Sequence, residues 1–195
     1  AAVAPAGARA RRLLVPALRA AVERAKAAAM AAAARGVPLH YDGDGNGSDG
    51  EQRTALHIAA RVGNAPLCAR LIVRHPPLLG TKTIVTRATP LHIAAAHGHV
   101  AVVVALLHGG ADVACGDRRG HTALWLAVAA NRIDVVQLLV AAITTLPQPK
   151  KVVVVAAKQR GSGDTALHVA ARLARGTIVR AMLPLYSDDD VCVLN

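Results

Sequence analysis

The chain has 195 residues, of which 53% are hydrophobic, yet Phe is absent and there are only one Trp and two Tyr, so Ala, Val, Leu and Ile must build the core. Lys and Arg number 23 against 12 Asp and Glu, a formal net charge of +11, which predicts an acidic partner such as nucleic acid, anionic lipid or an acidic protein. No apolar run reaches the roughly 18 residues of a transmembrane segment, and three cysteines without a Cys-x-x-Cys pair argue against a disulfide or zinc framework.

Residues 1–41 are rich in Ala and Arg and predict one or two helices, with Pro16 near a break and Gly36 as a C-terminal stop. Such a segment is either a solvated helical cap or a basic binding arm. Apart from its lack of Ser, it also resembles an organellar transit peptide. Together with the unpaired cysteines, it predicts an intracellular, reducing compartment, either cytoplasmic or organellar, including the mitochondrial matrix.

The stretch DGDGNGSDGEQR, from Asp42 to Arg53, begins like a calcium-binding loop, because acidic or amide oxygens alternate and Gly47 follows them. At the twelfth position, where a calcium loop supplies a bidentate Glu, this chain has the cation Arg53. We therefore expect residues 42–50 to form a Gly/Asp-rich linker.

Four later segments are similar to one another: TALHIAARVGN from Thr54, TPLHIAAAHGH from Thr89, TALWLAVAANR from Thr122 and TALHVAARLAR from Thr165. Each is followed by a second apolar stretch, so the pattern predicts four helix pairs. The threonines are placed as N-caps of the first helices. Gly63 and Gly98 fit a left-handed turn between the two helices of a pair.

This pattern resembles the ankyrin repeat, whose signature is Thr-Pro-Leu-His-x-Ala at a period of 33 residues. The resemblance covers residues 51–187 and implies an all-α solenoid of stacked helix-turn-helix units with hairpin loops. Within it, residues 1–41 become a cap or degenerate repeat and residues 188–195 an acidic tail.

The histidines at one repeat position, His57, His92 and His168, suggest either a metal array or a structural role. The ankyrin resemblance implies that each bonds back to its own Thr, and we expect no metal site. In the third unit Trp125 replaces this His, either as a core residue or as part of a contact surface.

The interval before the fourth repeat is ten residues longer than the period, and residues 144–163 read TTLPQPKKVVVVAAKQRGSG. The prolines break a helix, and the valine run predicts an extended piece or a longer hairpin. The insertion is either idle or a binding loop. Its candidate contact residues are Lys150, Lys151, Lys158 and Arg160.

Ankyrin arrays usually meet their partners on the concave side, which is formed by the hairpin tips and the exposed faces of the first helices. By this resemblance the candidate residues at the tips are Arg53, Arg87, Arg118, Arg119 and His121. The candidates at the first-helix ends are Arg61, His97, His99, Arg132, Arg172 and Arg175. This recurrence of Arg and His indicates either a basic groove or arginines scattered over the surface.

The sequence contains no recognisable set of acid, base and nucleophile, so we expect no catalysis, no cofactor and no small-molecule substrate. The first hypothesis is an adaptor or scaffold that binds a protein with an acidic surface or peptide through a basic concave face. The second is a structural subunit of a ribonucleoprotein, such as a mitochondrial ribosome, that contacts the RNA phosphate backbone. The third is a regulatory ankyrin domain of a larger protein.

Overall fold

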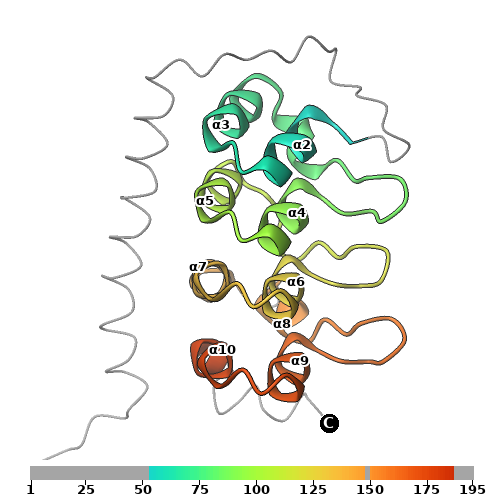
Figure 1. The fold of residues 1–195 in the computed structure, drawn as a ribbon, viewed down its shortest axis with the longest axis vertical. Coiled ribbons are helices and arrows are strands. Elements are labelled where there is room, and N and C mark those ends of the chain that lie inside the picture. Colours follow the sequence, from blue (N-terminus) through green and yellow to red (C-terminus); the bar gives the residue numbers. More distant parts are fainter. Residues whose placement is uncertain (1–52, 148–149, 187–195) are drawn as a thin grey trace, which may run out of the picture.

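The computed structural model describes residues 53–147 and 150–186, which fold into four helix pairs stacked along one axis (Figure 1). The first helices of the pairs are α2 (Ala55–Val62), α4 (Pro90–His97), α6 (Ala123–Ala129) and α9 (Ala166–Arg172). The second helices are α3 (Ala65–Arg74), α5 (Val100–His108), α7 (Ile133–Thr144) and α10 (Gly176–Met182). The first helices form one column and the second helices form another, and the hairpin loops extend outward beside the first helices. The predicted cap (1–41), the linker (42–50) with its partial resemblance to a calcium-binding loop, and the acidic tail (188–195) lie outside the described residues.

The predicted threonine caps begin the first helices. The backbone N–H of Thr89 donates to Nδ1 of His92 at 3.2 Å, and the Thr89 hydroxyl lies 2.7 Å from the same nitrogen. Because Nδ1 accepts these bonds, the proton of the neutral ring sits on Nε2, which donates to the carbonyl of His121 at 3.0 Å. His57 and His168 also bond to their own threonines. The expected structural role of the repeat histidine is therefore confirmed, and at His57 and His92 it extends to the next repeat, through the carbonyls of Ala88 and His121.

Burial of His92 predicts a pH-dependent stability. Desolvation is the largest effect on the pKa of His92 and lowers it from 6.5, against a smaller opposite effect of the His121 carbonyl. As the pH falls below 6.5, the unfolded chain takes up a proton more readily than the folded chain, so the free energy of unfolding should fall progressively between about pH 7 and pH 5. Urea denaturation across this range measures the fall. A His92→Gln variant should be less stable throughout but less sensitive to pH; an unchanged slope would assign the effect to other groups.

Each first helix is followed, at its C-cap or one residue later, by a residue with left-handed backbone geometry. Gly63 and Gly98 have φ angles of 83° and 84°, as their sequence positions predict. In the third and fourth repeats the same position holds Asn131 and Ala174, with φ angles of 59° and 53°. The turn between the two helices is thus the same in all four pairs.

Small aliphatic side chains fill the core, as the composition predicts. Leu56, Leu91 and Leu124 occupy one position in three successive first helices and are almost fully buried. Valines and leucines of α5 and α7 pack behind them. Because the paired alanines of α2 and α4 (Ala59 and Ala60, Ala94 and Ala95) are also buried, these neighbouring repeats approach closely.

Three short elements complete the described chain: the 3-10 helices η1 (Pro76–Gly80) and η2 (Leu183–Leu185), and α8 (Lys150–Val155). Here the sequence interpretation was wrong, because the valine run is a helix and not an extended piece. An isolated strand among helices has no neighbour to satisfy its backbone amides, whereas a helix satisfies them internally and still buries Val154 and Val155. The described part contains no β-strand, and one antiparallel bridge joins Gly116 to Thr122.

The described helices are all too short to cross a bilayer. The longest of them, α7, has 12 residues, whereas a span requires about 20.

Candidate functional site

Backbone hydrogen bonds join the hairpin loops of successive repeats at their tips. The N–H of Arg118 donates to the carbonyl of Thr86 at 2.8 Å, and the N–H of Arg160 donates to the carbonyl of Arg119 at 2.8 Å. A Cβ atom at Gly120 would lie 2.9 Å from the carbonyl oxygen of Lys158, and the φ angle there is 82°. Glycine at this position therefore lets two loops approach closely. Three loops far apart in sequence form one continuous edge.

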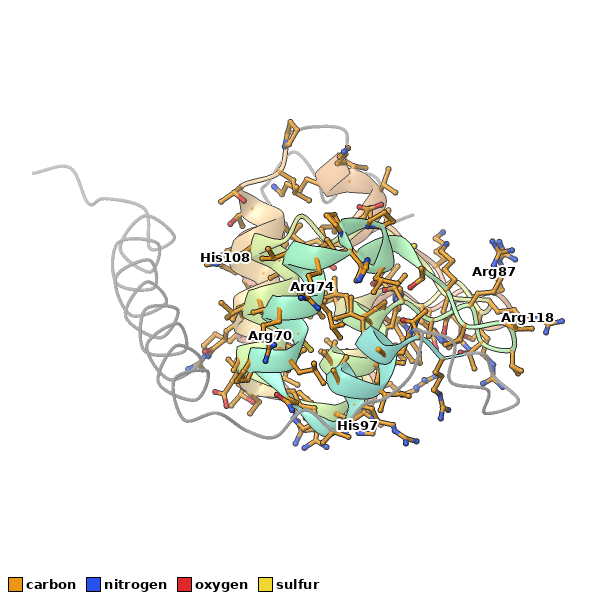
Figure 2. The ribbon with its side chains drawn as sticks, turned by 90° about the horizontal axis from the view of Figure 1, so that it is seen from above. Arg70, Arg74, Arg87, His97, His108 and Arg118 are labelled. Carbon is orange, nitrogen blue, oxygen red and sulfur yellow. The ribbon has the colours of Figure 1, made fainter. Side chains whose placement is uncertain are left out.

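This edge carries a row of exposed cations, which we call the hairpin-tip strip. Its members are Lys82, Arg87, Arg118, Arg119, Lys158 and Arg160. Figure 2 shows Arg87 and Arg118 together at the outer end of the loops, far from Arg70 and Arg74 on α3. Within residues 53–147 and 150–186, no carboxylate forms an ion pair with a member of the strip. Residues 53–147 and 150–186 together contain sixteen Lys and Arg and only four Asp. Among the described residues, no ion pair therefore compensates the positive charge of the strip.

Two of the three acidic residues in these loops, Asp117 and Asp164, are committed to other contacts. Asp117 accepts the backbone N–H groups of Arg119 and His121, each at 2.8 Å, and so closes its own loop. Asp164 pairs with Arg172 at 2.7 Å. Neither carboxylate neutralises the strip, and Asp117 fixes the loop that presents part of it.

A second group of basic residues lies at the ends of the first helices and connects repeats. Nε2 of His99 lies 2.9 Å from the carbonyl oxygen of Arg61, and Nε of Arg132 donates to Ala96 at 3.3 Å. Arg175 donates to the carbonyls of Val128 and Ala129. Each side chain caps the first helix of the preceding repeat, where a cation is favoured by the helix dipole.

This capping role was not predicted from the sequence, in which His99, Arg132 and Arg175 were only groove candidates. The signal was present, because His99, Arg132 and Arg175 each follow the left-handed residue that ends a first helix. Arg132 is also exposed, whereas His99 and Arg175 are half-buried.

Among the first-helix ends, Arg61 and His97 are exposed and belong to different repeats. The rings of His97 and His99 stack with centroids 5.9 Å apart. Partial burial, followed by the charges of His99, Arg132 and Arg61, lowers the pKa of His97. This end of the array is therefore also electropositive.

His121 does not belong to the exposed surface, so this candidate requires correction. Only 5% of the residue is exposed. Its ring lies 3.8 Å from that of Trp125, centroid to centroid, and its Nδ1 lies 3.1 Å from Asp117. His121 precedes the capping Thr122, and its carbonyl accepts the hydrogen bond from Nε2 of His92 in the previous repeat. This bond holds His121 within the array. Trp125 packs against the core beside it, in agreement with the core alternative.

Four further candidates predicted from the sequence are less accessible or already paired, or begin a helix. Arg53 and Lys151 are half-buried, Lys150 begins α8, and Arg172 is exposed but paired with Asp164. Burial raises the pKa of the Cys68 thiol to about 12, which makes it an unreactive core residue.

Helix pairs with capped threonines, left-handed turns and stacked hairpin loops define a helical repeat array for macromolecular contact. The chain matches the family described as "Ankyrin repeats (3 copies)" over residues 27–117, 56–148 and 110–193. It belongs to the ankyrin-repeat family, whose repeats mediate protein–protein interaction, and the resemblance seen in the sequence is confirmed.

The curated proteins it resembles are much longer. It is 35% identical over 128 residues to the probable E3 ubiquitin-protein ligase XBOS33 of Oryza sativa subsp. japonica, covering 66% of this chain and 23% of that protein. It is 31% identical over 131 residues to the probable E3 ubiquitin-protein ligase XBOS32 of the same organism, covering 67% of this chain and 25% of that protein. The ARF GTPase-activating protein Git of Drosophila melanogaster is 35% identical over 111 residues, covering 54% of this chain and 15% of that protein. The chain spans a quarter or less of each relative.

Proposed function

We propose that this chain is a non-enzymatic adaptor or scaffold module that binds an acidic surface or peptide of a protein partner. The hairpin-tip strip, together with Arg61 at the end of a first helix, supplies the positive charge. The observation that carries this proposal is the row of six exposed cations without a carboxylate partner in the described part of the chain. Because the loops are hydrogen-bonded to one another, a partner meets a preformed surface.

The small free energy of a single exposed ion pair favours an interface in which several cations contribute. One exposed ion pair contributes roughly 0.2–1 kcal/mol, so a single arginine decides little, whereas a row of cations also steers an acidic partner during approach. The proposal therefore predicts an effect for several residues changed together and a marked dependence on salt.

A protein partner is favoured over RNA by the aromatic residues of the described part. Trp125 and Tyr186 are both half-buried, and Trp125 is already stacked on His121. Neither offers a free ring for base stacking, which recurs in recognition of single-stranded RNA. The family's role in protein contact supports the same choice.

The relatives' names describe a ligase and a GTPase-activating protein, and the matched part covers a quarter or less of each. We infer that the part shared with this chain supplies binding in those proteins, not their chemical step. On this view the chain selects a protein for an activity that lies elsewhere.

A random 16-residue peptide library displayed on phage tests the proposal, with the full chain as bait. The wild-type protein should enrich peptides rich in Asp and Glu, and the enriched peptides should bind more weakly as salt is raised. The Arg87→Glu/Arg118→Glu/Arg119→Glu variant should bind them about tenfold more weakly, the sum of three modest ion-pair losses.

The matched control changes three exposed arginines on second helices, Arg70→Glu/Arg74→Glu/Arg180→Glu, and should leave the affinity nearly unchanged because the net charge is altered equally at another place. Melting temperatures verify that both variants fold. Absence of acidic enrichment, or equal losses in the two variants, would contradict the proposal. Tighter binding of polyuridylate RNA than of any enriched peptide would replace it with the nucleic-acid alternative.

A further inference from the structure

The loop between η1 and α4 has a rigid tip. The N–H of Thr83 donates to the carbonyl of Ala88 at 3.0 Å, and the N–H of Arg87 donates to the carbonyl of Thr83 at 3.0 Å. The Thr83 hydroxyl accepts the N–H of Ala88 at 3.1 Å and lies 2.7 Å from the hydroxyl of Thr86. Because Thr83 is buried and bonds to Thr86, Arg87 and Ala88, the turn at residues 84–86 is closed at its base, which restricts its conformations.

Two large aliphatic side chains occupy this tip and face solvent. Ile84 is 58% exposed and Val85 is 47% exposed. The corresponding turns of the next two loops contain Arg118 and Arg119, and residues 160–162, which are Arg, Gly and Ser. Loop tips are normally polar, and neither aliphatic side chain contributes to the core. Folding therefore gives no reason for Ile84 and Val85 to be apolar.

Cations border the aliphatic pair. Lys82 and Arg87 belong to the same loop. Nη1 of Arg118 lies 3.5 Å from the carbonyl oxygen of Val85, and the backbone N–H of Arg118 binds the same tip through Thr86. An apolar centre with a charged margin is the composition of a protein-binding hot spot and its rim.

We propose that Ile84 and Val85 anchor the interface, and that the partner is an acidic protein segment with large apolar side chains between its carboxylates. This inference rests on the proposed function and names the chemistry of its partner. Carboxylates meet Lys82, Arg87 and Arg118, while the apolar side chains cover Ile84 and Val85. The rigid loop lowers the entropic cost of this contact.

The same peptide selection tests the inference with a second variant, Ile84→Ser/Val85→Ser. Against wild-type bait, the enriched acidic peptides should carry Leu, Ile, Phe or Trp between the acids. Against the variant they should remain acidic but lose this apolar preference. The best wild-type peptide should bind the variant about tenfold more weakly, because the contact of two aliphatic side chains is removed.

The matched control is Val73→Ser/Leu183→Ser, which removes two exposed aliphatic side chains, 81% and 57% exposed, from α3 and η2. It should bind like the wild type. Acidic enrichment without an apolar preference, or the same preference in the Ile84→Ser/Val85→Ser variant, would overturn this inference and leave the proposed function intact. No acidic enrichment at all would defeat the proposed function itself. Vesicles of phosphatidylserine that bind wild type but not the Ile84→Ser/Val85→Ser variant would assign the tip to a membrane surface and also overturn it.

Discussion

Replacing His92 with alanine is expected to lower the free energy of unfolding by about 3 kcal/mol. The ring joins two repeats: Nδ1 accepts the N–H of Thr89, and Nε2 donates to the carbonyl of His121. The residue is almost fully buried, so its removal leaves both backbone groups without a partner and opens a cavity. Urea denaturation at pH 7 or above, where the ring is neutral, measures the change.

The control is His168→Ala, at the same position of the fourth repeat. His168 bonds to its own Thr165 at 2.8 Å but is exposed, and its Nε2 has no hydrogen-bond partner within the described residues. Only the cap is lost there, so the expected cost is about 1 kcal/mol. The difference between the variants measures the contribution of the bond between repeats. Equal losses would show that the His121 carbonyl contributes nothing to this coupling.

The sequence was sufficient for everything that a repeat specifies locally. A threonine cap braced by histidine needs a hydroxyl at one position and a His three residues later, and Thr54–His57 and Thr89–His92 satisfy this within a single helical turn. The left-handed turn at Gly98 follows from a single residue type. Such features recur with the period, so four copies of the pattern determine the fold.

Features that depend on contacts between repeats could not be predicted in this way. The valine run forms helix α8 because no strand lies beside it. The β propensity of valine says nothing about whether a neighbouring strand is present. Arg132 was assigned to a binding groove because it is charged, whereas its guanidinium reaches back to Ala96 of the preceding repeat. The apolar tip at Ile84 gave no periodic signal at all, since the other described loops have no counterpart.

Gly98→Ala is expected to cost about 2 kcal/mol of stability from two separate causes. With a φ angle of 84°, any side chain at this position carries a penalty of roughly 1 kcal/mol. In addition, a Cβ atom would lie 2.7 Å from Cδ of Arg132, so that side chain must move and give up its bond to the Ala96 carbonyl. Thermal and urea denaturation of the folded chain measure the total.

Two comparisons separate these causes. Gly110 has a φ angle of 89° and no atom within 4 Å of the added Cβ, so Gly110→Ala should show the backbone cost alone, about 1 kcal/mol. In an Arg132→Ala background, Gly98→Ala should likewise cost only about 1 kcal/mol, because the cap is already absent. If Gly98→Ala costs the same in both backgrounds, Arg132 does not stabilise the preceding repeat. Its whole guanidinium would then be available to a partner, and the binding surface would extend from the hairpin-tip strip to the first-helix ends.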